Sequence, residues 1–165
     1  MTRTRLEAIE ASDKPVLMSH ANPAAMCPNP RNPSDDVIKA LVKAGGVMGV
    51  MPLRMLLTPD EPTTLDHYIN HIDYVCDLAG PECVGFGLET PPEGFDSIPA
   101  ENQIPLPSYL RNPGEQRKLD LPELCHIHRL YTLVEAMIRR GFTDHDIRGF
   151  IGGNFERVLR EILTV

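Results

Sequence analysis

Residues 15–51, PVLMSHANPAAMCPNPRNPSDDVIKALVKAGGVMGVM, contain the segment that decides the fold. The apolar run 15–18 predicts a short buried strand. A proline-rich loop then leads to a helix that Ser34 can cap and that Gly45 ends. The apolar run 47–51 is compatible with a second buried strand. A strand, a helix and a strand in this order predict parallel pairing with a right-handed crossover.

The same alternation continues on both sides of this segment. Residues 4–11 predict a helix before the first strand. Downstream, Thr63 or Thr64 can cap a long helix that ends at Gly80. Residues 83–87, CVGFG, predict a third strand, whose glycines favour close approach of the backbone to a ligand or a neighbour.

Residues 88–122 interrupt this regular order. The stretch is rich in proline and predicts a long loop, which inside a compact domain is often functional or mobile. Beyond it, an amphipathic helix covers 130–138, a capping box over 143–146 begins a short helix, and Asn154 can cap the last one. We therefore expect a single α/β domain over residues 1–165, with about three strand–helix units and closing helices.

The composition excludes several classes of partner. The chain has 165 residues, with 23 acidic against 16 basic side chains and a formal net charge of −7. It has no basic stripe, no tryptophan and only 5% aromatic residues, so we expect no nucleic-acid partner. No run approaches the roughly 18 apolar residues of a membrane helix, and the start lacks the apolar core of a signal peptide. The expected location is the cytoplasm, without membrane association.

The four cysteines, and the histidines other than His20, form no recognisable ligand set. The chain has no CxxC pair, so we expect reduced structural thiols, with a disulfide or a metal role as the alternative. His67 and His71 are spaced i, i+4 but lack an HExxH pattern, and we interpret them as surface residues. Besides His67 and His71, this group without a ligand set comprises Cys27, Cys76, Cys83, Cys125, His126, His128 and His145.

Three side chains follow strands or precede a helix, where chemistry is often placed. A neutral imidazole at His20, after the first strand, suits zinc; the alternative is a loop histidine bonded to backbone. The Arg31 guanidinium suits a carboxylate; the alternative is an ion pair with Asp35 or Asp36. Glu89 follows the third strand and suits a substrate ammonium or a catalytic water; the alternative is a solvated loop glutamate.

Three segments carry a family resemblance, in the order 6–50, 67–87 and 139–162. The first contains SHANP and RNPSDD, the second reads HYINHIDYVCDLAGPECVGFG, and the third reads RRGFTDHDIRGFIGGNFERVLREI. Together they resemble the membrane dipeptidase (renal dipeptidase-like) family of zinc peptidases. The resemblance implies the C-terminal portion of a (β/α) TIM-barrel-type fold, an incomplete barrel because three strands cannot close one.

The resemblance also implies roles for these side chains. Such enzymes hold two zinc ions and hydrolyse dipeptides with a metal-bound hydroxide. His20 matches the zinc histidine that ends the sixth barrel strand. Arg31 matches the arginine that grips the C-terminal carboxylate of the substrate. Glu89 falls where the family usually has an aspartate that helps with the substrate amine and the attacking water.

The other zinc ligands of the family have no counterpart in this chain, so it offers one ligand alone. We expect zinc-dependent dipeptide hydrolysis only when a missing N-terminal half, on a longer or a separate chain, completes the barrel. The alternatives are an inactive barrel remnant or interaction module that forms a homodimer through its open edge, and a related amide hydrolase whose substrate suits Glu89.

Overall fold

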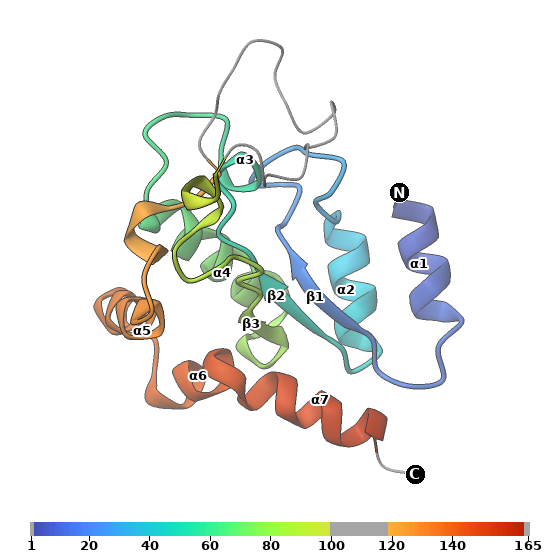
Figure 1. The fold of residues 1–165 in the computed structure, drawn as a ribbon. Coiled ribbons are helices and arrows are strands. Elements are labelled where there is room, and N and C mark those ends of the chain that lie inside the picture. The colour runs from blue at the N-terminus through green and yellow to red at the C-terminus, as the bar shows by residue number, and fades with distance from the viewer. Residues whose placement is uncertain (1, 100–118, 164–165) are drawn as a thin grey trace.

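The computed structural model describes residues 2–99 and 119–163 (Figure 1). Within this part, the chain forms one three-stranded parallel sheet with helices between the strands. The strands are β1 (Leu17–Ala21), β2 (Val47–Val50) and β3 (Val84–Phe86), in the spatial order β1-β2-β3. The predicted α/β class and parallel sheet are confirmed. Because β2 lies in the middle, β1 and β3 each keep one edge that no other described strand pairs.

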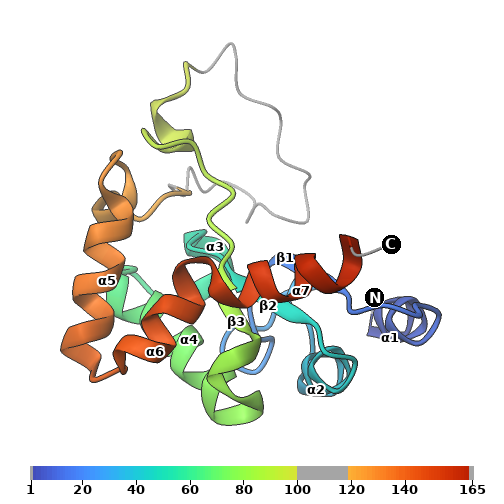
Figure 2. The same ribbon diagram turned by 90° about the horizontal axis from the view of Figure 1, so that it is seen from below.

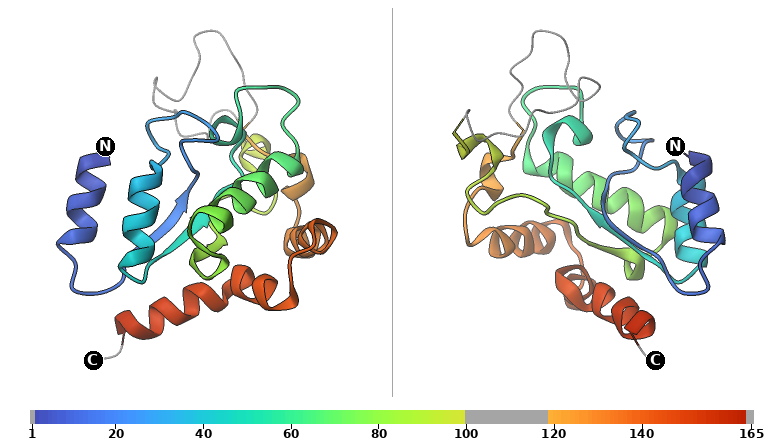
Figure 3. Two further views of the ribbon diagram at one scale, coloured as in Figure 1. Left: turned by 180° about the vertical axis from the view of Figure 1, so that it is seen from behind. Right: turned by 45° about the vertical axis from the view of Figure 1, so that its right-hand side comes forward.

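The α-helices are the other main elements of the described residues. They are α1 (Thr2–Glu10), α2 (Asp35–Lys43), α3 (Arg54–Leu57), α4 (Leu65–Ala79), α5 (Arg129–Arg140), α6 (Asp144–Arg148) and α7 (Asn154–Leu163). Figure 3 shows α2 and α4 side by side over one face of the sheet, with α1 outside α2. None of the described helices is both long enough and apolar enough to cross a membrane.

The core lies between the sheet and this helical layer. The central strand is fully buried, as expected for a parallel strand covered by crossover helices. The side chains that meet it from the helices are apolar and at most 1% exposed: Val37, Ile38, Leu41, Tyr68, Ile69, Ile72 and Val75. Fully burying one side chain of this size contributes about 1.5–3 kcal/mol, so this packing is the main source of stability for the sheet.

Strand β1 differs from its prediction in position and in shape. The apolar run ends at Met18, but pairing continues to Ala21, because a backbone ladder does not require apolar side chains. Met18 pairs with Met48 and Ala21 pairs with Val50, so β1 has one more residue than β2 over this interval. This bulge contains His20. Bulges bend a strand and redirect a side chain, and they are frequent beside active sites.

Helix α7 lies across the amino ends of the strands (Figures 1 and 2). The Asn154 amide donates to Pro81 O at 2.8 Å and to Val84 O at 2.7 Å, beside the start of β3. The Arg157 guanidinium donates to Gly45 O at 3.1 Å, just before β2. Asn154 was expected to cap this helix, but it is a helical residue whose side chain ties α7 to the sheet. The carboxyl ends of the strands lie at the opposite edge of the sheet.

The prediction for His71 is wrong. Its side chain is 1% exposed, and its Nε2 donates to Leu57 O at 2.7 Å. Helix α4 packs against both the sheet and α3, so its buried arc is wider than one apolar stripe and includes this position. His67 is half-buried and joins the Thr64 capping box at the start of α4.

The segment 88–122 contains the described 3-10 turn Phe95–Ser97, and a second one, Pro122–Leu124, begins at its last residue. Residues 100–118 of the predicted loop lie outside the described part of the chain. The reciprocal contacts of Asp96 and Asp120 join the two described ends: Asp96 N donates to Asp120 Oδ2 at 2.7 Å, and Asp120 N donates to Asp96 Oδ2 at 3.3 Å.

Candidate active site

His20 and Glu89 meet at the carboxyl edge of the sheet. His20 Nε2 lies 3.4 Å from Glu89 Oε1. The two side chains are 36% and 45% exposed, so the pair is open to a ligand. His20 comes from β1 and Glu89 from the loop after β3, which are separated by β2. The structure therefore brings together two of the three residues selected from the sequence.

Two glycines allow this meeting across the middle strand. A Cβ added at Gly49 would overlap Ser19 O and lie 2.8 Å from Gly87 Cα. A Cβ added at Gly87 would overlap Ser19 O and lie 2.8 Å from Gly49 O. The absence of side chains thus lets the ends of all three strands converge. The expectation that glycines of the third strand mark close backbone approach is confirmed at Gly87.

The two ring nitrogens of His20 face different side chains. Ser19 Oγ lies 2.8 Å from His20 Nδ1, while Nε2 faces Glu89. A histidine that ligates a metal commonly holds its other ring nitrogen in such a hydrogen bond, which fixes the tautomer and the ring orientation. Ser19 is therefore a site residue that the sequence analysis missed, although it precedes His20 directly.

Arg31 lies in the loop between β1 and α2, and its backbone is held on both sides. Its amide donates to Asn29 Oδ1 at 2.9 Å, and its carbonyl accepts from Arg5 Nη2 at 2.6 Å. Among the described residues, the Arg31 guanidinium has no ion pair with Asp35 or any other acid. Asp35 Oδ2 instead accepts from Tyr74 Oη at 2.7 Å, and this bond raises the pKa of Tyr74.

Two buried asparagines join this loop to the segment after β2. Asn22 Nδ2 donates to Met51 O and Leu56 O, and Asn22 Oδ1 accepts from Met51 N, at 3.0–3.1 Å. Asn32 Nδ2 donates to Cys27 O at 2.8 Å and also to Leu56 O at 3.2 Å. Asn22 is two residues from His20 and Asn32 is next to Arg31, so these contacts fix the loop that carries Arg31 directly after the strand that carries His20. The sequence did not indicate this role for the two asparagines, because polar residues are ordinary in a proline-rich loop.

The described residues do not complete a zinc site alone. His20 is the single side chain predicted to ligate zinc, whereas a catalytic zinc usually takes three protein ligands. Across residues 2–99 and 119–163 there is no group of three or more His, Cys, Asp or Glu side chains that could hold a metal ion. His20 can supply one ligand of such a site.

The other sulfur and imidazole groups are structural where they are buried. The four cysteines form no disulfide with one another. Burial raises the pKa of the Cys76 thiol, and it raises the pKa of Cys83 to about 11, so both are poor nucleophiles. Burial lowers the pKa of His71 to about 4, which keeps this imidazole neutral at pH 7.

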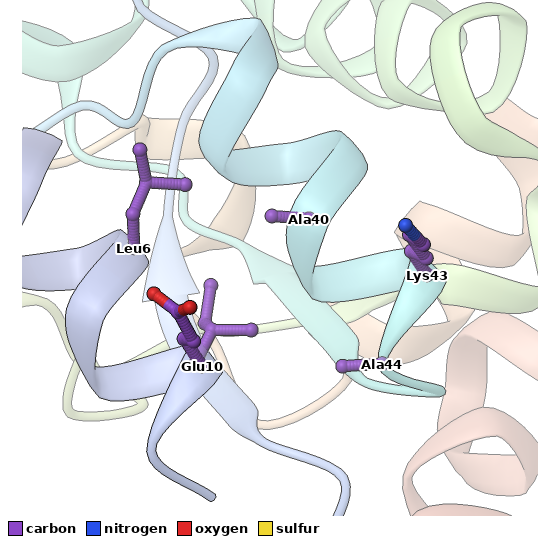
Figure 4. A pocket seen from close by; sticks show the side chains of 6 residues that line it. Leu6, Glu10, Ala40, Lys43 and Ala44 are labelled. Carbon is purple, nitrogen blue, oxygen red and sulfur yellow. The ribbon is translucent and has the colours of Figure 1, made fainter.

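A shallow groove lies apart from this pair, between α1 and α2 (Figure 4). Four apolar side chains, Leu6, Ile9, Ala40 and Ala44, line it together with Glu10 and Lys43. None of these residues belongs to the His20–Glu89 pair, and the lining has no imidazole, hydroxyl or thiol. The carboxyl edge of the sheet is therefore the better candidate for chemistry.

Comparison with known proteins agrees with the fold. Solved structures with a similar fold include an amidohydrolase from Pseudomonas aeruginosa, with a TM-score of 0.77 and 28% identity over 96% of this chain and 49% of that chain. A metallopeptidase from Rhodobacter sphaeroides, solved with a phosphinate mimic of the dipeptide L-Ala-D-Ala, has a TM-score of 0.73 at 19% identity, over 95% of this chain and 39% of its own.

Curated relatives include dipeptidases from fungi and a mammal. Dipeptidase verJ of Clonostachys rogersoniana is 28% identical over 98% of this chain and 35% of its own length. Dipeptidase 3 of Rattus norvegicus is 26% identical over 96% of this chain and 28% of its own length. The chain thus spans about a third of the relatives it matches. The family model for membrane dipeptidases, peptidase family M19, matches residues 1–107, and the chain belongs to this family.

Proposed function

We propose that this chain forms one part of a (β/α) barrel that hydrolyses dipeptides with the help of zinc. The observation that carries the proposal is the meeting of His20 and Glu89, 3.4 Å apart at the carboxyl edge of a parallel sheet. This edge carries the active site in barrels of this type. Membership of a dipeptidase family supports the reaction class.

Each of the three residues has a role in this proposal. His20 supplies one imidazole ligand through Nε2, with Ser19 holding Nδ1. Arg31 binds the C-terminal carboxylate of the dipeptide, because its guanidinium has no ion-pair partner among the described residues. Glu89 binds the substrate ammonium or orients the attacking water. When bound, zinc would supply an activated water and polarise the scissile carbonyl.

The proposal requires further strands and ligands. The sheet has an unpaired edge at β1 and another at β3 within the described residues, and three strands cannot close a barrel. We propose that the remaining part of the barrel, on the same or on a separate polypeptide, pairs with these edges and brings the other zinc ligands.

Zinc stoichiometry tests this function. We would purify the 165-residue chain with and without the polypeptide encoded directly upstream, and measure bound zinc and hydrolysis of free dipeptides. The proposal expects two zinc ions and activity only when the upstream part is present, and loss of zinc from that complex in His20→Ala. A zinc-free, inactive complex contradicts it.

The second candidate is an inactive module that pairs with a copy of itself. The two open strand edges favour it, as do exposed apolar side chains on α7, where Leu159 is 40% and Leu163 is 71% exposed. A stable, zinc-free homodimer that the upstream polypeptide does not dissociate would support this candidate. A zinc-loaded complex that hydrolyses other amides but no dipeptide would support a related amide hydrolase.

A further inference from the structure

Arg129 connects helix α5 to the loop that carries Glu89. Its Nη1 lies 2.8 Å from Thr90 O, 3.0 Å from Thr90 Oγ1 and 3.2 Å from Pro91 O. Arg129 is the first residue of α5 and is part-buried, whereas Thr90 and Pro91 directly follow Glu89. A single guanidinium nitrogen therefore binds the two residues that follow Glu89, while β3 precedes Glu89 in the chain.

The position of Arg129 is unfavourable for the helix itself. The amino end of a helix carries partial positive charge, so a cation in the first turn is repelled. In residues 2–99 and 119–163, no carboxylate forms an ion pair with Arg129 to offset this. Its three acceptors are uncharged oxygens of the loop. The loop contact, rather than helix stability, accounts for this arginine.

The loop that Arg129 holds contains an unusual backbone conformation. Glu89 has a φ of 43°, the only positive φ of a non-glycine residue in the described part of the chain. The left-handed region is unfavourable for a residue with a Cβ, so the surroundings must enforce it. On the sheet side, Gly87 N donates to Val50 O at 2.8 Å. On the other side, the Arg129 contacts fix Thr90.

We propose that Arg129 is a positioning residue: it holds Glu89 in the left-handed conformation that places the carboxylate opposite His20. The catalytic consequence rests on the proposed function, but the positioning does not, because it concerns the backbone of this chain alone. Without Arg129, the three oxygens of Thr90 and Pro91 lose their donor. Glu89 then relaxes to negative φ, and its side chain moves away from His20.

NMR on the 165-residue chain tests the positioning. The three-bond HN–Hα coupling and the Cα and Cβ shifts of Glu89 report its φ, and NOEs between its side chain and the His20 ring report their proximity. We expect Arg129→Gln to lose both signatures and Arg129→Lys to keep part of them. Arg139→Gln is the matched control, because Arg139 lies on the same helix, is 62% exposed and, among the described residues, forms an ion pair with Glu135 alone. It should leave both signatures unchanged.

Unchanged Glu89 signatures in folded Arg129→Gln would overturn the proposal. If that variant unfolds, Thr90→Val, which removes one acceptor only, gives the same readout: a partial loss supports the proposal, and no change overturns it. In the completed zinc-loaded protein, Arg129→Gln and Glu89→Gln should lower kcat non-additively. Lost signatures with full activity would leave the positioning intact and refute the role of Glu89 in the proposed function.

Discussion

In Arg31, the backbone has a structural role, whereas the guanidinium is available to bind a substrate. Its backbone is fixed by Asn29 and Arg5, while its guanidinium has no ion pair in the described part of the chain. An arginine held in this way can bind a carboxylate without first breaking another contact. This arrangement is consistent with the role proposed for it and leads to a specific kinetic expectation.

In the completed, active protein, Arg31→Ala should raise KM for free dipeptides about 10- to 100-fold, as expected for a charged hydrogen bond of roughly 1.5–3 kcal/mol. Dipeptides with an amidated carboxyl terminus should be nearly unaffected, because they lack the charged group that Arg31 binds. Steady-state kinetics on both substrates measures the difference, with Arg139→Ala as the control. Equal losses on both substrates would contradict a role in carboxylate binding.

His71 makes stability depend on pH. Burial lowers its pKa to about 4 in the folded chain, below the ordinary 6.5. The unfolded state therefore binds a proton first as pH falls, and the contribution of the neutral imidazole, complete above pH 6.5, is lost between 6.5 and about 4. A shift of this size corresponds to a decrease of about 3 kcal/mol in the free energy of unfolding.

His71→Gln is the variant that isolates this contribution. A glutamine amide can still donate to Leu57 O, but it does not titrate. Urea unfolding of both proteins between pH 7 and pH 4 should give a steeper loss of stability for the wild type than for the variant. Parallel curves over this range would show that His71 does not titrate as its burial implies.

Among the elements, the three strands converge near His20 and Glu89 because Gly49 and Gly87 have no side chains. Gly49→Ala would place a Cβ against the backbone oxygen of Ser19, which no side-chain rotation can relieve. We expect a loss of stability of about 3 kcal/mol and a longer distance between His20 and Glu89. In Gly153→Ala the added Cβ would lie 3.0 Å from Arg148 O and 3.6 Å from Arg148 C, so this substitution should cost less. Denaturant unfolding and His20–Glu89 NOEs measure both effects; an undisturbed pair in Gly49→Ala would contradict this account.

The elements also show what the sequence could predict. Apolar runs and glycine stops located all three strands and the main helices, because burial and helix termination are local signals. The bulge in β1, the buried His71 and the sheet contact of Asn154 depend on partners far away in the chain. The same holds for the site: the places of His20 and Glu89 at strand ends made them predictable, whereas Asn22 and Arg129 act through contacts with residues far away in the chain. Ser19 contacts its neighbour His20, but this contact depends on the conformations of both side chains.

At the scale of the whole molecule, the sheet is covered at the amino ends of its strands but unpaired along its two sides. Helix α7 covers the amino ends of the strands through contacts from Asn154 and Arg157. The sides of the sheet are open, with β1 and β3 each unpaired on one edge within the described residues. Open edges and exposed apolar side chains favour association, so the sheet itself indicates where a complementary part would bind.

Hydrogen exchange tests this arrangement. In the isolated 165-residue chain, amides of β1 and β3 should exchange faster than those of the central β2, because edge strands open more readily. Adding the complementary part of the barrel should slow exchange in β1 and β3 and raise Tm, with a 1:1 mass by light scattering. A homodimer that protects a single edge would favour the inactive module. Protection confined to α7, with both strands unchanged, would mean that the complementary part binds the helix and does not extend the sheet.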